Sequence, residues 1–167
     1  MKDRVRETLF DLLGTGVREA IALDLFAGTG ALGFEALSRG AARAVFCDRH
    51  FPTADALRRT AAALGVADRV EVRSGDVLLW ARRMPDLPTD AAWIVFVSPP
   101  WSFFAERRAD VDALIAAVLS RAPAGSTVAV ESDAGFTPAP PPPAAGGAGW
   151  TTRPMPPAVL HLLRTRA

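Results

Sequence analysis

The chain has 167 residues, enough for one domain that buries about 70% of the surface its unfolded form would expose. Half of its residues are hydrophobic and 22% are charged, which are ordinary values for a globular protein. The net charge of +1 does not match the strongly basic balance of a dedicated RNA binder, and the single cysteine excludes an internal disulfide.

Alternating helix and strand patterns run along most of the chain. Val5, Leu9 and Leu12 lie on one side of an amphipathic helix predicted over residues 4–13, within an N-terminal segment 1–14. Beyond it we expect strands at 21–26, 43–48, 69–74, 92–98 and 126–131, and helices at 31–39, 53–64, 77–84 and 107–121. Repeated strand–helix–strand units predict a parallel sheet with helices on both faces.

The pattern changes near the end of the chain. Residues 137–149 are rich in proline and glycine, which predicts an irregular loop. Residues 150–153 and 158–165 predict two closing strands, and the whole chain, 1–167, is expected to be a single domain.

A glycine-rich turn joins the first predicted strand to the helix at 31–39. Gly28 and Gly30 permit positive φ and close backbone approach, and Gly33 allows the helix to lie near a strand. The glycine spacing alone is a weak signal. A strand before it and a helix after it form the structural context in which such a turn binds a nucleoside cofactor. Asp48 follows about 20 residues later and can accept hydrogen bonds from both ribose hydroxyls.

Asp24 at the end of the first predicted strand discriminates between cofactors. A carboxylate in an apolar strand costs free energy unless it is paired or hydrated. It would repel the pyrophosphate of a dinucleotide, whereas S-adenosylmethionine offers an ammonium group as a partner. The alternative is that Asp24 only caps the glycine turn. Asp76 can accept a hydrogen bond from the adenine amine and also cap the helix that begins near Val77.

The segment Ile94–Trp101 contains a second candidate site. Four apolar residues predict a buried strand, which Pro99 and Pro100 end because proline supplies no N–H to a sheet. The carboxyl end of this predicted strand therefore brings together backbone carbonyls, the Ser98 hydroxyl and the Trp101 ring. Ligands bind at this end of the strands in open α/β sheets. This arrangement suits a planar group with an amine, such as a nucleobase. The alternative is a strand that ends in a loop with a core tryptophan.

Four segments resemble the RsmD-type methyltransferases, which modify the N2 amine of a guanine in bacterial small-subunit ribosomal RNA. These segments are Asp3–Phe10, Leu23–Arg39, Ile94–Trp101 and Val130–Ser132. The resemblance implies an α/β, Rossmann-like class I methyltransferase fold with a mostly parallel seven-stranded sheet and a C-terminal antiparallel hairpin. It also implies S-adenosylmethionine as the cofactor and ribosomal RNA, within an assembled small-subunit particle, as the partner.

The resemblance also assigns the site residues. The cofactor would be bound by Asp24, Phe26, Gly28, Gly30, Asp48, Asp76 and Val77. The target base would be held by Ser98, Pro99, Pro100 and Trp101. In this hypothesis Trp101 stacks on the base, while the Ser98 hydroxyl and the Pro99 carbonyl accept hydrogen bonds from its amine, so that the protein contributes mainly positioning.

Two features depart from the family pattern. The family usually has Asp or Asn where Ser98 stands, so Ser98→Asp or Ser98→Asn is expected to raise the rate if position 98 limits it. The family usually carries a basic hairpin before the first helix, and only two residues precede Asp3 here, so weak binding to naked RNA is expected. Arg107 and Arg108 are candidates either for phosphate contact or for a solvated helix face.

Other functions stay open at this point. A nicotinamide-dependent enzyme could use the same turn, although Asp24 and the short chain argue against it. A weakly active or inactive methyltransferase-like RNA-binding protein, a DNA adenine methyltransferase and a protein glutamine methyltransferase are further alternatives. His50 and His161 are far apart in the sequence, so no metal site is predicted. No leader or membrane-spanning stretch is recognised, so a cytoplasmic protein is expected, and a monomer is compatible with the sequence.

Overall fold

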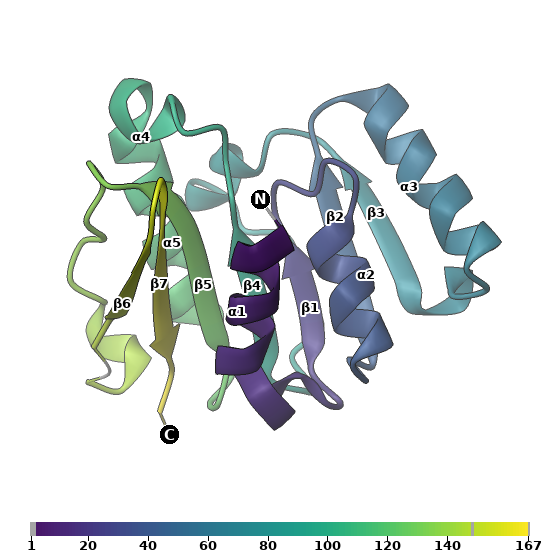
Figure 1. Cartoon of the computed structure of the whole chain (residues 1–167), viewed down its shortest axis with the longest axis horizontal. Coiled ribbons are helices and arrows are strands. Elements are labelled where there is room, and N and C mark those ends of the chain that lie inside the picture. Colours follow the sequence, from purple (N-terminus) through teal and green to yellow (C-terminus); the bar gives the residue numbers. More distant parts are fainter. Residues whose placement is uncertain (1–2, 148, 167) are drawn as a thin grey trace.

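One seven-stranded sheet forms the centre of the computed structural model, which describes residues 3–147 and 149–166 (Figure 1). The strands are β1 (Ile21–Asp24), β2 (Arg43–Asp48), β3 (Val70–Ser74), β4 (Trp93–Val97), β5 (Thr127–Asp133), β6 (Thr151–Met155) and β7 (Ala158–Arg164). Their spatial order is β3-β2-β1-β4-β5-β7-β6. β1 to β5 are parallel, and β7 is antiparallel to both β5 and β6, which confirms the predicted closing hairpin.

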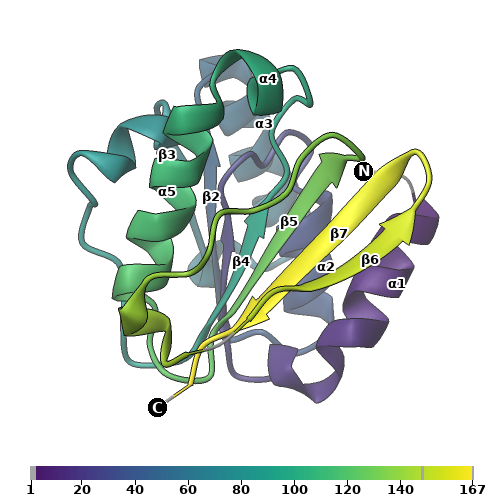
Figure 2. The ribbon, with the colours of Figure 1, turned by 90° about the vertical axis from the view of Figure 1, so that its left-hand side faces the viewer.

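Helices cover both faces of this sheet. The α-helices are α1 (Asp3–Leu13), α2 (Ala31–Ser38), α3 (Phe51–Ala63), α4 (Phe103–Glu106) and α5 (Arg108–Arg121). The 3-10 helices are η1 (Gly14–Val17), η2 (Ala67–Arg69), η3 (Val77–Ala81) and η4 (Pro143–Ala145). Figure 2 shows α5 on one side of the sheet and α1 on the other. Within the described residues, no helix is both long enough and apolar enough to cross a membrane.

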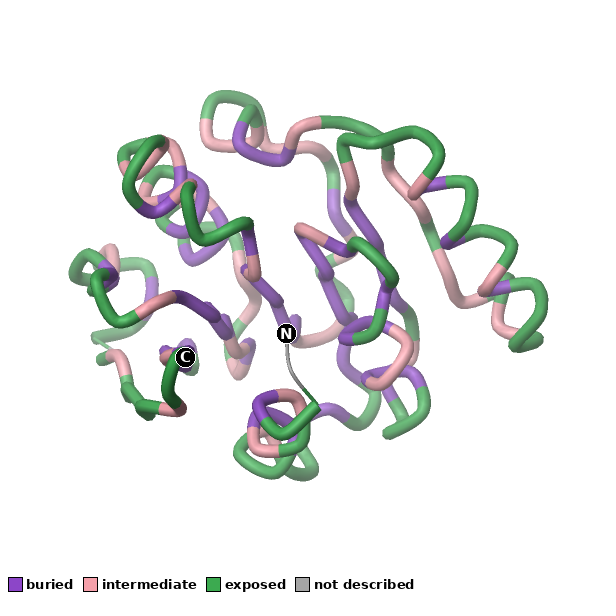
Figure 3. The backbone as a smooth tube through the Cα atoms, turned by 45° about the horizontal axis from the view of Figure 1, so that its top comes forward, coloured by how far each residue is buried: buried purple, intermediate pink, exposed green. Residues whose placement is uncertain are grey.

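The core is divided by the sheet into two apolar layers. Side chains alternate along a strand, so Ile21 and Leu23 contact the layer of α5 while Ala22 contacts the layer of α1 and α2. Figure 3 shows the buried residues concentrated along the strands, with exposed residues on the outer faces of the helices. The layers hold the strands rigidly, so that the loops at their carboxyl ends are held in place.

One predicted helix is wrong in type and length. The expected helix at 77–84 is only the 3-10 helix η3, which buries Val77 and Leu78 and ends at Ala81. Pro85 follows four residues later, and the chain continues without regular structure to β4. So short a segment gains few α-helical hydrogen bonds, and the residue before a proline disfavours helical geometry.

The proline-rich segment 137–149 is irregular apart from η4, as predicted, although Ala148 lies outside the described residues. It packs against the sheet through the buried Ala145. The indole N–H of Trp150 donates a hydrogen bond of 3.0 Å to the Ala139 carbonyl. The loop thus covers the apolar layer of α5 beyond β5, where a further helix would otherwise be needed.

Candidate functional site

A cavity of about 920 Å³ opens at the carboxyl edge of the parallel strands. One wall consists of the loops that follow β1, β2, β3 and β4, and the other consists of α1 and the turn between β6 and β7. This volume is that of a typical site for a small organic ligand. Its position is where open α/β sheets bind ligands.

The glycine turn adopts the geometry that its sequence predicts. Gly28 and Gly30 have φ values of +52° and +79°, in the left-handed region that side chains disfavour. A Cβ on Gly33 would lie 2.3 Å from Cε1 of Phe46, so glycine lets α2 approach β2 closely. The turn lies at the edge of the cavity, which Phe26 and Gly28 line.

Asp48 is held by two backbone amides. Its Oδ2 accepts a hydrogen bond of 3.0 Å from the Gly28 N–H, and its Oδ1 accepts one of 2.8 Å from the His50 N–H. Each carboxylate oxygen has a second lone pair, so Asp48 can still accept hydrogen bonds from a ligand. Because Gly28 donates its N–H to Asp48, this amide is not available to a pyrophosphate.

Asp24 lies beneath the glycine turn and is only 2% exposed. Its Oδ2 accepts a hydrogen bond of 3.1 Å from the Gly33 N–H at the start of α2. Burial raises the pKa of Asp24 to about 7, and the hydrogen bond from Gly33 opposes part of that rise. Neither Asp24 nor Gly30 lines the cavity. The capping role is therefore present in the structure, and pairing with a cofactor ammonium stays a prediction.

Asp76 caps η3 as predicted, because its Oδ1 accepts a hydrogen bond of 3.0 Å from the Leu78 N–H. Its Oδ2 accepts one of 3.2 Å from Nη1 of Arg107, which also pairs with Asp110. Arg107 was a candidate for phosphate contact, but these two carboxylates occupy its guanidinium. Asp76 also lines the cavity, and its role in binding the cofactor stays a prediction.

Arg108 is likewise occupied by intramolecular contacts. It pairs with Asp112 at 2.6 Å and donates a hydrogen bond of 2.6 Å to the Thr137 carbonyl. Its guanidinium also lies 4.5 Å from the centre of the Phe136 ring. It therefore ties α5 to the segment after β5, and the structure supports neither a free phosphate contact nor a purely solvated face.

The segment after β4 places its predicted residues together on the cavity. Ser98, Pro99, Pro100 and Trp101 all line it. Trp101 is 36% exposed, so the alternative of a core tryptophan is wrong for this residue. The tryptophan of the core is Trp93, which starts β4 and is 1% exposed. An exposed ring beside a small hydroxyl leaves room for a planar ligand.

Sequence reasoning missed Glu131, whose carboxylate accepts a hydrogen bond from the Ser98 hydroxyl. Glu131 belongs to β5, is 5% exposed and lines the cavity. The available signal was an acid that directly follows the apolar run Val128–Val130. Such an acid is costly to bury, and it therefore merits attention as a candidate functional residue.

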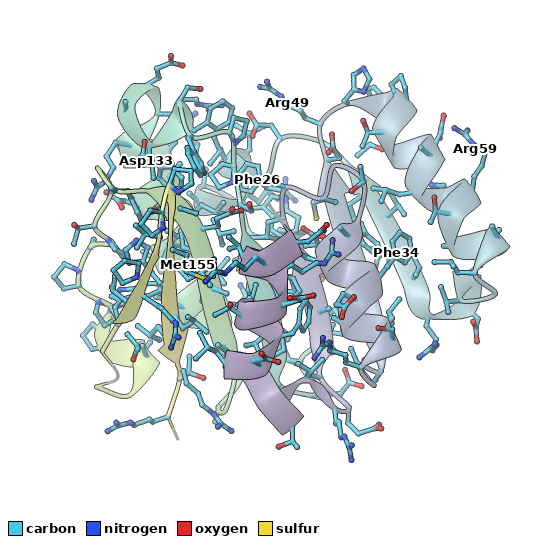
Figure 4. The ribbon with its side chains drawn as sticks, in the orientation of Figure 1. Phe26, Phe34, Arg49, Arg59, Asp133 and Met155 are labelled. Atoms are coloured by element: carbon cyan, nitrogen blue, oxygen red, sulfur yellow. The ribbon has the colours of Figure 1, made fainter. Side chains whose placement is uncertain are left out.

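Sequence reasoning also missed three arginines that line the cavity from different elements. Arg4 comes from α1, Arg49 from the loop after β2 and Arg153 from β6, and all three are exposed. Within the described residues, none of them forms an ion pair. Figure 4 shows Phe26 and Arg49 toward the carboxyl edge of the sheet and Arg59 on the outer side of α3. We call Arg4, Arg49 and Arg153 the basic rim.

No group of three or more His, Cys, Asp or Glu side chains in the described ranges is placed to hold a metal ion. The acidic groups of the cavity instead accept hydrogen bonds from backbone amides and from Arg107 and Ser98.

Comparisons with known proteins identify the family of the chain. Residues 1–137 match the model of a family described as "Conserved hypothetical protein 95". The chain is 40% identical over 99 residues to ribosomal RNA small subunit methyltransferase D of Escherichia coli strain K12, an alignment that covers 59% of this chain and 48% of the relative. The chain thus spans about half the length of the curated relatives it matches.

Two solved structures resemble the whole fold. The Escherichia coli protein yhhF is 28% identical with a TM-score of 0.82, and the match covers 100% of this chain and 88% of that one. An RNA methyltransferase from Salinibacter ruber, solved with S-adenosyl-L-homocysteine, is 21% identical with a TM-score of 0.67 and coverage of 99% and 93%. The second likeness shows the shared fold.

Proposed function

The chain belongs to the family described as Conserved hypothetical protein 95, and we propose that it is an S-adenosylmethionine-dependent methyltransferase of ribosomal RNA. The resemblance to RsmD-type methyltransferases is confirmed by the family and its named relatives. The fold is the Rossmann-like class I methyltransferase fold. The observation that carries the proposal is one cavity that joins Asp48 and Asp76 to the segment Ser98–Trp101.

The residues of the cavity fit S-adenosylmethionine better than a dinucleotide. Asp48 keeps lone pairs for ribose hydroxyls, and Asp76 lies across the cavity as an acceptor for the adenine amine. Phe26 and Val77 supply apolar surface for the rest of the cofactor. Because the Gly28 N–H donates to Asp48, this amide of the turn is not available to the phosphates of a dinucleotide.

The other half of the cavity suits a base that has been unstacked from its strand. Trp101 offers a ring for stacking, and the Ser98 hydroxyl and the Pro99 carbonyl offer acceptors for an exocyclic amine. When bound, the cofactor supplies an electrophilic methyl group. The protein then contributes orientation of the amine nitrogen toward that methyl group and exclusion of water.

We infer that the target is the N2 amine of a guanine in small-subunit RNA, presented in an assembled particle. Relatives named ribosomal RNA small subunit methyltransferase D support the RNA class. The net charge of +1 supports a folded particle over naked RNA, because little net positive charge is available to attract phosphates, and the arginines of the basic rim are those that line the cavity without an ion pair within the described residues.

The test has a binding arm and a transfer arm. Calorimetry should detect binding of S-adenosylhomocysteine and none of NADH, and the reverse result would overturn the cofactor assignment. Tritiated methyl transfer should then be measured side by side on 30S subunits, naked ribosomal RNA, DNA and protein. We expect 30S subunits to be labelled most. Labelling of DNA or protein alone would favour the adenine or glutamine alternatives, and no labelling together with RNA binding would favour an inactive binding protein.

A further inference from the structure

The ring of Phe103 is contacted by two arginines at the half of the cavity proposed for the cofactor. Phe103 lies on α4, lines the cavity and packs edge-on against Phe26, with ring centres 6.4 Å apart. The guanidinium carbons of Arg49 and Arg107 each lie 5.5 Å from the centre of the Phe103 ring, within the range of cation–π attraction. Phe103 is only half-buried, so its ring also presents apolar surface to the cavity.

The two arginines differ in what else holds them. The Arg107 guanidinium pairs with Asp76 and Asp110, so two carboxylates fix its place. Arg49, a member of the basic rim, is exposed and forms no ion pair within the described residues. A guanidinium that lies on a ring keeps its N–H donors for other partners, and a phosphate matches their geometry. Arg49 is thus the arginine of the two that is open to an external anion.

The contact between Arg49 and Phe103 passes across the carboxyl end of β1. Arg49 follows β2 and Phe103 follows β4, and β1 lies between these two strands in the sheet. Figure 4 shows Arg49 beyond Phe26, which itself follows β1, and farther from the strands. Because Arg49 is exposed, the contact lies on the solvent side of the cavity. A cofactor between Asp48 and Asp76 would therefore leave past this contact.

We propose that Arg49 couples RNA binding to retention of the cofactor. A backbone phosphate of the RNA, bound by the N–H groups of Arg49, holds the contact with Phe103 closed over the bound cofactor. The inference rests on the proposed function, because it concerns the cofactor and the RNA of that site. An exposed arginine samples many rotamers, and a phosphate that fixes it in one of them makes the contact open less often. The cofactor is then retained until the RNA leaves.

Such coupling acts in both directions. If bound RNA raises the affinity for the cofactor, bound cofactor must raise the affinity for RNA by the same factor. A cofactor that packs against the Phe103 ring restricts its motion, and the ring then holds Arg49 where a phosphate can bind it at a lower entropic cost. The order of binding that follows is cofactor first and RNA second.

The first experiment measures the release of the cofactor product. Protein loaded with tritiated S-adenosylhomocysteine is chased with the unlabelled compound, alone or with saturating 30S subunits assembled from unmodified transcripts. Subunits should slow release severalfold in wild type. Without subunits, Arg49→Ala and Phe103→Leu should release the compound about two- to fivefold faster than wild type, which corresponds to the loss of one exposed cation–π contact. Adding subunits should then slow release little in either variant.

The second experiment measures the affinity for 30S subunits with and without S-adenosylhomocysteine. Phe103→Leu keeps apolar volume and leaves Arg49 in place, so its affinity without the compound should equal that of wild type. Adding the compound should raise the affinity of wild type and should leave those of Phe103→Leu and Arg49→Ala unchanged. Arg59→Ala removes an exposed arginine on α3, outside the cavity, and should behave as wild type in both experiments (Figure 4).

The outcomes separate this inference from the function beneath it. If wild type binds S-adenosylhomocysteine and 30S subunits but releases the compound equally fast with and without them, the coupling alone is overturned. Faster release with subunits would also overturn it, because the phosphate would then draw Arg49 away from Phe103. Failure of wild type to bind S-adenosylhomocysteine or 30S subunits would overturn the proposed function as well. If Phe103→Leu does not fold, Arg49→Ala decides, and full coupling in this variant contradicts the proposal.

Discussion

At the scale of single residues, the acids around the cavity are positioned mainly by backbone amides. Asp24 accepts the N–H of Gly33, and Asp48 accepts those of Gly28 and His50. Bonds from amides to carboxylates are stronger than neutral ones and have directions set by the backbone. The carboxylates therefore keep their places before any ligand binds, which lowers the entropic cost of binding.

Asp24 should make stability depend on pH. Its pKa rises from 3.8 to about 7 on folding, so the native state keeps a proton that the unfolded chain has already released. The stabilisation by this proton is complete below about pH 4 and is lost as pH rises through about 7. The free energy of unfolding should fall by up to about 4 kcal/mol from this group. Asp24→Asn keeps an acceptor for Gly33, and it should remove this fall.

Urea unfolding of both proteins at about pH 5 and about pH 8 measures the effect. Burial lowers the pKa of His161, so that group contributes a change of opposite sign, but equally in both proteins. The difference between the two proteins therefore isolates Asp24. Equal pH dependence in wild type and Asp24→Asn would mean that the buried carboxyl does not titrate in this range.

Trp101 should contribute to substrate binding by stacking. Trp101→Ala removes a ring that lines the cavity, and base–aromatic stacking is worth about 1–3 kcal/mol, so the KM for 30S subunits should rise several-fold to about a hundredfold. Phe51→Ala removes a ring on α3 that is 71% exposed and outside the cavity, and it should change nothing. Steady-state kinetics at saturating cofactor measures the KM of both variants and of the wild type. An unchanged KM in Trp101→Ala would exclude stacking.

At the scale of secondary structure elements, the close contact of α2 with β2 shapes the glycine turn. Cε1 of Phe46 occupies the space that a Cβ on Gly33 would need, and Phe46 packs against Phe34 with ring centres 4.6 Å apart. Phe46 is fully buried and has little room to move. The position of α2, and with it the position of the glycine turn, therefore depends on the absence of a side chain at Gly33.

Gly33→Ala should therefore destabilise the protein. Overpacking of this kind costs about 1–3 kcal/mol, and the better helix propensity of alanine offsets up to about 1 kcal/mol of it. Gly16→Ala is the matched control, because a Cβ there meets nothing within 4 Å. Urea unfolding should show a lower midpoint for Gly33→Ala and little change for Gly16→Ala. Equal midpoints would contradict the close approach of α2.

The elements also show what local sequence could and could not predict. Apolar runs predicted the central strands β1, β4 and β5, because a buried strand carries its own signal, whereas β3 (Val70–Ser74) and the exposed β6 (Thr151–Met155) were expected as strands without such a run. The hydrogen bond from Ser98 to Glu131 was not predicted, because it depends on the register between β4 and β5, which are separated by α4 and α5. Register is set by packing of the whole sheet, and no pattern within either strand contains it.

At the scale of the whole molecule, charge placement matters more than the net charge of +1. Many arginines are paired with nearby acids, as in Arg43–Asp90 and Arg58–Asp55. The basic rim gathers around the cavity from three elements that are distant in sequence. The sequence could not show this arrangement, and it indicated Arg107 as a phosphate contact because Arg107 is close to Trp101 in the chain. In the structure the Arg107 guanidinium pairs instead with Asp76 and Asp110.

The basic rim should therefore determine the salt dependence of RNA binding. Replacing Arg4, Arg49 and Arg153 by alanine should reduce the slope of log affinity against log salt by up to about 3, since each phosphate contact contributes about 0.7–0.9. Arg83→Ala, an exposed arginine away from the cavity, is the control and should leave the slope unchanged. Fluorescence anisotropy on a ribosomal RNA fragment across a salt series measures it. An unchanged slope in the triple variant would place the RNA elsewhere.

The most direct test of the central claim is the identity of the methylated nucleoside. Small subunits assembled from unmodified transcripts are incubated with the protein and S-adenosylmethionine, and the RNA is digested and analysed by mass spectrometry. The proposed function predicts N2-methylguanosine, formed much more slowly by Trp101→Ala, whose ring lines the cavity. Methylation at another base, or N2-methylguanosine formed equally fast by Trp101→Ala, would contradict the account.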